Sequence, residues 1–237
     1  MGTAVLQKQF TEVLGGQFAW RERPTPETAR TGISELDAVT GGLPRGCLTE
    51  IFGAASSGRS SLLASIVAAS TERQEVCALV DAEDSFDPLS AAAAGVRLER
   101  LLWIRCAHNA EHALKAADLL IQGGGFGLVA MDLGDTPPAI ARRISLTSWF
   151  RLRRAVENTP TVLVTVARQS NAKTCASMML ECVRERVSWV GGGCLLRGAR
   201  VRVTRSKPGR ALTASYDAAA LGGQTPWSAR VPLDPPA

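Results

Sequence analysis

The chain has 237 residues, of which 46% are hydrophobic and 21% charged, and this composition excludes a disordered or fibrous protein. Its length fits one sizeable domain with appendages, or at most two small domains. No apolar run approaches the about 18 residues that a membrane-spanning helix needs, and the N-terminus lacks the pattern of a secretory signal. We therefore expect a soluble cytoplasmic protein with no membrane partner.

Positive charge is concentrated in the second half of the chain. Residues 139–210 contain 15 lysines and arginines against 3 acidic residues, whereas residues 1–138 contain 11 against 17. Such a basic segment is typical of proteins that bind a polyanion, because each cation that neutralises a phosphate releases counterions. We expect a nucleic-acid partner, and the alternative is an arginine-rich surface that faces solvent only.

The N-terminus has the periodicity of a short helix. Apolar residues from Leu6 to Leu14 recur on one helical face, and two glycines follow them. This predicts an N-terminal helix within residues 1–20, which either folds back on its own core or joins copies into a homo-oligomer. Residues 21–31 contain two prolines and are predicted to be a linker.

Residues 32–216 are predicted to form an α/β core domain. Its expected strands span residues 47–52, 76–80, 101–105, 128–131 and 161–166, and its expected helices span residues 60–70, 111–122 and 141–157. This alternation predicts a mostly parallel sheet with helices on both faces. Residues 193–216 show strands without helices, which predicts an antiparallel C-terminal extension.

The C-terminal residues 217–237 contain four prolines and two adjacent glycines, and we expect a flexible tail there. Trp227 lies in this tail. It is either an incidental residue or the anchor of a partner-binding motif.

The segment between the first strand and the first helix resembles a phosphate-binding loop of pattern GxxxxGK[ST]. Its residues, the candidate nucleotide-binding set, are Gly53, Ala54, Ala55, Ser56, Ser57, Gly58, Arg59 and Ser60. In this pattern backbone amides cradle phosphates, the lysine reaches the β- and γ-phosphates, and the hydroxyl holds Mg²⁺. Arg59 takes the place of the lysine, and a planar guanidinium is a poor substitute for a compact ammonium group. We expect weak ATP binding, with Ser60 on Mg²⁺ when nucleotide binds, and no efficient turnover.

Several segments resemble the core of the RecA recombinases. They are residues 32–37 (GISELD), 41–46 (GGLPRG), 50–58, 81–88 and 128–132. The resemblance covers residues 31–216 and implies a RecA-like P-loop NTPase fold. It also implies that Glu83 activates the attacking water, Asp132 lies near Mg²⁺ and Asp87 contacts adenine. By the same resemblance Gln169 is the sensor glutamine, and Arg205 and Lys207 reach a neighbouring protomer's nucleotide.

The chain also departs from the RecA pattern. Ser90 replaces the aromatic residue that stacks on adenine, residues 168–188 lack the glycine-rich DNA-binding loop, and we expect no RecA C-terminal domain after Tyr216. A short RecA-like chain with an altered ATP site resembles the ImuA group of RecA paralogues. This resemblance implies an accessory role in translesion synthesis with an ImuB-like polymerase partner or RecA. It places the protein in the bacterial cytoplasm, at the nucleoid after DNA damage.

The predicted helix over residues 141–157 is the most informative basic element. Trp149, Leu152 and Val156 lie on one side of it, and the other side carries arginines around Phe150, a combination that suits single-stranded DNA. Candidate nucleic-acid contacts are Arg142, Arg143, Arg151, Arg153, Arg154 and Lys173. The alternative is an amphipathic helix that covers the sheet and exposes its arginines to solvent.

Metal and disulfide chemistry is not expected. His108 and His112 match the HxxEH zinc pattern, but the sequence offers no third ligand. The six cysteines occur singly and are predicted to be free, buried thiols.

The sequence thus predicts a DNA-binding scaffold of the DNA-damage response whose ATP site is degenerate. One alternative is an active DNA-dependent ATPase or recombinase of the RecA family. The other is a protein-binding inhibitor resembling SulA, the cell-division inhibitor, without nucleic-acid contact.

Overall fold

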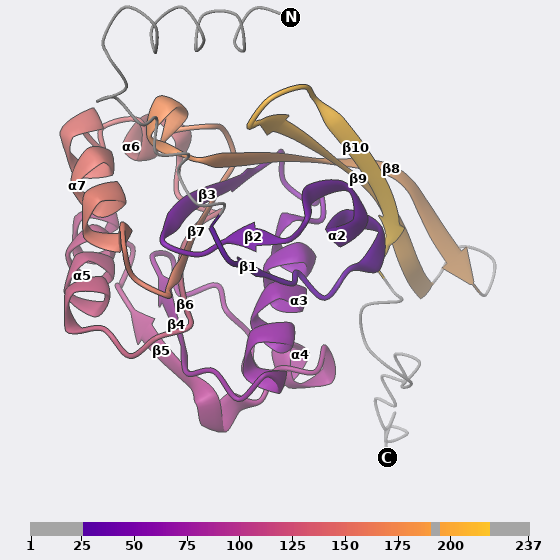
Figure 1. Cartoon of the computed structure of the whole chain (residues 1–237). Coiled ribbons are helices and arrows are strands. Elements are labelled where there is room, and N and C mark those ends of the chain that lie inside the picture. The colour runs from indigo at the N-terminus through magenta and orange to yellow at the C-terminus, as the bar shows by residue number, and fades with distance from the viewer. Residues whose placement is uncertain (1–25, 191–194, 219–237) are drawn as a thin grey trace, which may run out of the picture.

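The computed structural model describes residues 26–190 and 195–218. An eight-stranded sheet, with strand order β10-β9-β8-β3-β7-β6-β4-β5, lies between two layers of helices (Figure 1). Its strands are β3 (Cys47–Phe52), β4 (Cys77–Asp81), β5 (Leu101–Arg105), β6 (Leu128–Leu133), β7 (Val162–Ala167), β8 (Met178–Val190), β9 (Leu195–Lys207) and β10 (Leu212–Asp217). The mixed α/β fold with a mostly parallel sheet confirms the predicted fold class.

Helices cover both faces of the sheet. They are α2 (Ser34–Thr40), α3 (Arg59–Glu72), α4 (Pro88–Ala93), α5 (Ala110–Gly123), α6 (Pro138–Ala141) and α7 (Leu146–Val156), with 3₁₀ turns η1 (Leu98–Arg100) and η2 (Lys173–Cys175). One apolar core lies between the sheet and the helices α2 and α3, and a second lies between the sheet and the helices α5 and α7. Every residue of β4 and β7 is buried, which explains their continuous apolar sequences.

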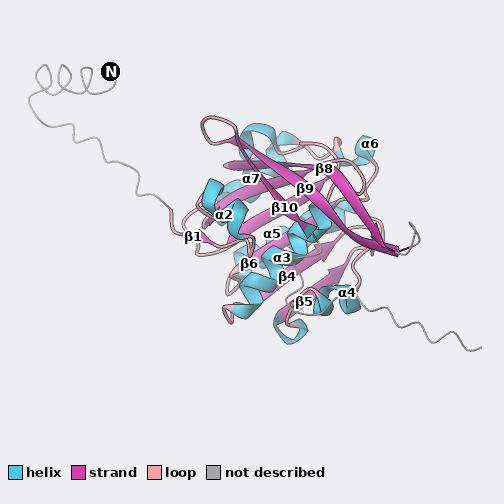
Figure 2. Cartoon of the chain, turned by 90° about the vertical axis from the view of Figure 1, so that its right-hand side faces the viewer, coloured by secondary structure: helices cyan, strands magenta, loops and turns pink. Residues whose placement is uncertain are grey.

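The C-terminal strands extend the sheet as predicted. β8 runs parallel to β3 over Met178–Glu181 and then pairs antiparallel with β9, which pairs antiparallel with β10. Only the first part of the 13-residue strand β8 contacts β3. Beyond Arg186 of β8, where the pairing of β9 with β10 also ends, β8 and β9 continue as a two-stranded ribbon, and both are long strands in Figure 2. The sequence analysis did not identify β8.

Two other predictions differ from the structure. The single helix expected over residues 141–157 is wrong: α6 ends at Ala141, and α7 begins after Ser145, whose hydroxyl accepts a hydrogen bond from the Ser148 backbone amide at 3.1 Å. The predicted linker contains a short strand, β1 (Thr28–Ala29), which pairs with β2 (Leu43–Pro44). Ala29 is buried there because it joins the core beside α2. The predicted N-terminal helix and almost all of the predicted tail lie outside the described residues.

The described cysteines are free thiols, and all except the partly exposed Cys47 are buried. Burial raises the pKa of Cys77 and of Cys182 to about 12, so both remain protonated and behave as small apolar side chains. Cys194 lies outside the described residues. Within the two described ranges, no helix has both the length and the apolar character needed to cross a bilayer.

Candidate functional site

The phosphate-loop segment joins β3 to α3, as its pattern predicts. Gly58 has a φ of 94°, and a Cβ at this position would clash with the side chain of Val201 on β9. A Cβ at Gly53 would clash with the backbone carbonyl of Cys182 on β8. Glycine is therefore required at both ends of the loop, because the C-terminal strands pack directly against it.

Arg59 is almost fully buried, with 5% of its surface exposed, and its guanidinium is bonded within the protein. It donates to the carbonyl oxygen of Gly53 at 2.5 Å and to that of Gly134 at 2.6 Å, and it lies 3.4 Å from a carboxylate oxygen of Asp135. These contacts tie the loop to the segment after β6. The guanidinium at the lysine position is thus already engaged by acceptors within the protein.

Asp132 lies at the end of β6, as the resemblance predicted. Its carboxylate accepts a hydrogen bond from the Gly134 amide at 2.7 Å. Burial, and then the nearby charge of Asp81, raise the pKa of Asp132 to about 6, although the Gly134 hydrogen bond and Arg59 oppose this rise. Asp132 and the exposed Ser60 are suitable oxygen donors for Mg²⁺. The guanidinium of Arg59, however, is not free to contact phosphate, so the residues do not fit an ATP–Mg²⁺ complex as observed.

Glu83 is held by two residues that the sequence analysis did not link to it. One carboxylate oxygen accepts a hydrogen bond from the Thr136 hydroxyl at 2.7 Å, and the other lies 2.9 Å from Nδ1 of His108. The three residues follow β4, β6 and β5 respectively, which are neighbours in the sheet. Carboxyl ends of parallel strands meet at one edge of a sheet, so the position of each residue after a predicted strand was a partial signal. Which of these strand ends are neighbours follows only from the strand order in the structure.

Asp87 caps helix α4. Its carboxylate accepts hydrogen bonds from the amides of Leu89 and Ser90, each at 3.2 Å, and from the Ser90 hydroxyl. These bonds, that from the Ser90 hydroxyl first, lower the pKa of Asp87. Ser90, at the position of the stacking aromatic residue, thus contacts the carboxylate that was expected to contact adenine.

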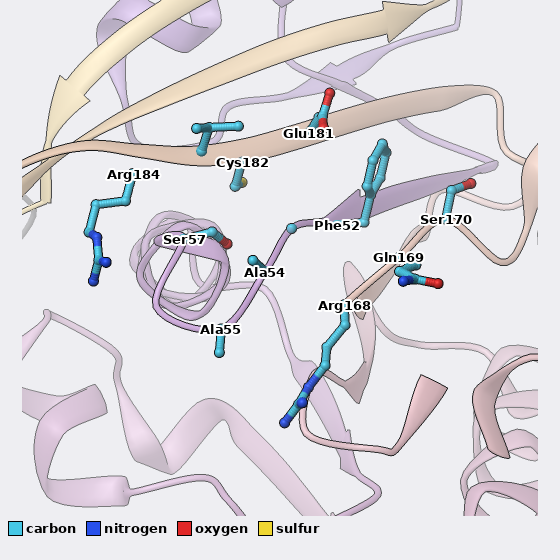
Figure 3. Close-up of a pocket in the computed structure, with 12 residues that line it drawn as sticks. Phe52, Ala54, Ala55, Ser57, Arg168, Gln169, Ser170, Glu181, Cys182 and Arg184 are labelled. Carbon is cyan, nitrogen blue, oxygen red and sulfur yellow. The ribbon is translucent and has the colours of Figure 1, made fainter. Parts of the chain in front are cut away.

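The end of β7 carries Arg168 and Gln169. Arg168 donates to the Gly134 carbonyl at 3.2 Å and lies 3.7 Å from Asp135, so it reaches the same segment as Arg59. Gln169, the predicted sensor, accepts a hydrogen bond from Arg142. A pocket of about 450 Å³ lies between the phosphate loop, the end of β7 and strand β8 (Figure 3).

Arg205 and Lys207 lie on β9, as the sequence placed them. Lys207 donates to the backbone carbonyls of Thr174 at 3.2 Å and Ala176 at 2.6 Å, within its own chain. Nε of Arg205 is buried and has no hydrogen-bond partner among the described residues. Their predicted contact with a neighbouring protomer remains a prediction.

Some of the residues predicted to contact nucleic acid form ion pairs within the described part of the chain, and others do not. Arg151 pairs with Asp118 and Arg153 with Glu157, each at 3.4 Å. Arg143 and Arg154 are exposed and form no ion pair in the described part of the chain, and Phe150, one helical turn before Arg154 on α7, is 43% exposed. Trp149, Leu152 and Val156 are buried, as expected. Lys173, in the turn η2, is exposed.

No metal cluster occurs in residues 26–190 and 195–218: no group of three histidine, cysteine or acidic side chains is placed to hold an ion there. His108 of the HxxEH pattern instead contacts Glu83.

Comparisons with known proteins identify the family. The RecA N-terminal domain model matches residues 7–139, more than half of the chain. The RecA protein of Deinococcus radiodurans is 29% identical over 218 residues, 82% of this chain and 56% of that protein. The RecA protein of Chloroflexus aurantiacus is 31% identical over 154 residues, 58% of this chain and 44% of that protein. The chain spans about half the length of these curated relatives. It belongs to the RecA family.

Proposed function

We propose that this chain is a DNA-binding accessory protein of translesion synthesis, similar to the ImuA group, whose ATP site is degenerate. The observation that carries the proposal is the buried guanidinium of Arg59, which is bonded to Gly53, Gly134 and Asp135. ATP turnover requires a positively charged side chain that contacts the transferred phosphate and stabilises its developing negative charge. Here that charge is held by protein acceptors, and Glu83 is likewise held by Thr136 and His108.

The charge distribution supports nucleic acid as the partner. Residues 139–210 contain 15 basic against 3 acidic residues, and Arg143 and Arg154 are free of ion pairs among the described residues. Phe150 is exposed one helical turn from Arg154 on α7 and offers a ring for base stacking. A SulA-like inhibitor that acts only by protein binding would not require a basic surface for nucleic-acid contact. We further propose an ImuB-like polymerase or RecA as protein partners, and bacterial cytoplasm as the location.

The test is fluorescence anisotropy of labelled single-stranded DNA over a salt series, with and without ATP–Mg²⁺. We expect the logarithm of the affinity to fall linearly with the logarithm of salt, without an effect of ATP. The double variant Arg143→Ala/Arg154→Ala should reduce the salt slope by about 1–2, because about one counterion is released per phosphate contact. The matched control is Arg97→Ala, an exposed arginine outside the basic segment, which should leave the slope unchanged.

Three outcomes would contradict the proposal. Binding that tightens with ATP–Mg²⁺ would favour an active DNA-dependent ATPase. Absence of binding at low salt would favour a protein-only inhibitor. An equal loss of DNA binding in the double variant and in the Arg97→Ala control would show that Arg143 and Arg154 do not form the DNA contact.

A further inference from the structure

The outer ribbon, residues 187–190 of β8 and 195–199 of β9, has one apolar face. Residues directly opposite each other in an antiparallel pair share a face, and successive residues of a strand alternate between faces. Val187 lies opposite Ala199, and Trp189 lies opposite Leu196. These four residues therefore share one face of the outer ribbon. Val201 shares it too, because Val201 is two residues after Ala199 on β9.

This apolar face is covered near the domain and exposed further out. Val201 is fully buried in the core that the sheet forms with helices α2 and α3. Trp189 and Leu196 are 55% and 51% exposed, and Figure 1 shows the far ends of β8 and β9 beyond both helices. Adjacent exposed apolar residues are typical of protein interaction sites, and tryptophan is enriched among the residues that contribute most to binding. The outer ribbon is therefore a candidate interaction surface.

Arginines flank the apolar residues along both strands. Residues 183–190 and 195–202 contain five arginines and one acidic residue. Arg200 and Arg202 form ion pairs with that acidic residue, Glu185, at 3.6 and 3.5 Å. The arginines of the two segments that form no ion pair among the described residues are Arg184, Arg186 and Arg197. A partner of this surface is therefore expected to carry negative charge beside its apolar residues.

We propose that the outer ribbon docks an amphipathic helix of another protein, with acidic residues beside the apolar face of that helix. A helix is the usual cover of an apolar sheet face, as α3 is beside Val201, and the partner's helix continues that layer outward. A nucleic acid fits less well, because the exposed face is apolar and phosphates require cations. The ribbon of a second copy fits less well, because it brings arginines against arginines. The proposal goes beyond the proposed function and does not depend on it, because α7 packs on the opposite face of the sheet.

The test is fluorescence anisotropy of a labelled peptide of about 18 residues, or about five helical turns, titrated with the full chain. The peptide consists of leucine, alanine and glutamate in the pattern of an amphipathic helix. We expect saturable binding, and Leu196→Ser should weaken it about tenfold or more because an apolar contact is lost. The matched control is the same substitution at another exposed leucine, Leu119→Ser on α5. It should leave the peptide affinity unchanged.

Charge reversal at Arg197 provides a second, independent variant. Arg197→Glu should weaken binding of the glutamate peptide about tenfold, and it should strengthen binding of a peptide in which lysine replaces each glutamate. Leu196 and Arg197 are both exposed, so neither substitution is expected to disturb the fold, and circular dichroism checks this.

Several results overturn the docking proposal. They are absence of binding of the glutamate peptide, equal binding of the lysine peptide to the unaltered chain, and an equal loss of affinity in Leu119→Ser and Leu196→Ser. A lower oligomeric state of Leu196→Ser in sedimentation also overturns it, because a second copy then covers the ribbon. Equal losses of single-stranded DNA and peptide affinity in Leu196→Ser assign the surface to nucleic acid instead. Absence of DNA binding by the unaltered chain, with the peptide still bound, contradicts only the proposed function.

Discussion

Glu50 is a buried carboxylate on β3 that holds the loop after β7 in place. It is fully buried and accepts hydrogen bonds from the Ser170 hydroxyl at 2.7 Å and from the amides of Asn171 and Ala172 at 2.5 and 2.8 Å. Replacing it by alanine leaves three donors without an acceptor. Each such donor costs about 1–3 kcal/mol, and removal of the buried charge offsets part of that cost. We expect Glu50→Ala to lower the free energy of unfolding by about 3–5 kcal/mol.

Urea unfolding followed by circular dichroism measures this loss, and the melting temperature should fall by roughly 6–20 °C for a domain of this size. Trypsin should also cleave faster after Arg168, because the loop that follows it loses its anchor. The control is Glu181→Ala on β8, whose side chain is exposed and which should change the unfolding free energy by less than about 0.5 kcal/mol. A loss below about 1 kcal/mol in Glu50→Ala would refute the reasoning that these three bonds organise the loop.

Three further variants test other parts of the structure. Arg59→Lys should tighten ATP–Mg²⁺ binding at least about tenfold in a fluorescent-nucleotide titration, and unchanged affinity would show that Arg59 does not limit the site. The pKa of Asp132, about 6 in the folded chain against an ordinary 3.8, means that folding favours its protonated form, so its destabilising effect appears as the pH rises through about 6. Asp132→Asn should therefore raise the unfolding free energy by about 1–3 kcal/mol at pH 8, and the difference from the unaltered chain should vanish near pH 4. Trp149→Ala should cost about 3–5 kcal/mol in urea unfolding because Trp149 is 1% exposed, whereas its 43% exposed neighbour Phe150 should tolerate alanine with less than about 1 kcal/mol lost.

The centre of the sheet was predictable because its strands are buried on both faces. β3 begins and ends where its apolar run does, and β4, β6 and β7 differ from the predicted ranges by one or two residues. The edge strand β5 is only partly buried, but its short apolar run also matches its bounds. Strand β8 was missed for the same physical reason. From Val183 to Arg186 its residues are exposed, and Arg184, Glu185 and Arg186 place charges on both faces, so neither an apolar run nor an alternation identifies this part of the strand.

The candidate site was predictable only where it is local in sequence. The phosphate loop is one continuous segment, and its glycines and arginine were recognisable at once. The contacts of Glu83 with Thr136 and His108, and of Arg59 with Asp135, join residues from different strand ends. Such contacts depend on strand order, which the sequence pattern does not specify. The break between α6 and α7 was missed because hydroxyl capping at Ser145 competes with a helical pattern that otherwise continues.

The strand order has a consequence for how the chain folds during synthesis. β7 lies between β3 and β6 in the sheet, and it pairs Val162 with both Cys47 and Leu128. Strands β3 and β6, which are made earlier, therefore cannot be joined into one sheet until β7 has left the ribosome, more than 100 residues after β3. At about 5–20 residues per second this interval lasts seconds, during which the edge of β3 that faces β7 has no partner. The N-terminal half of the chain is thus the segment on which chaperones have the longest time to act.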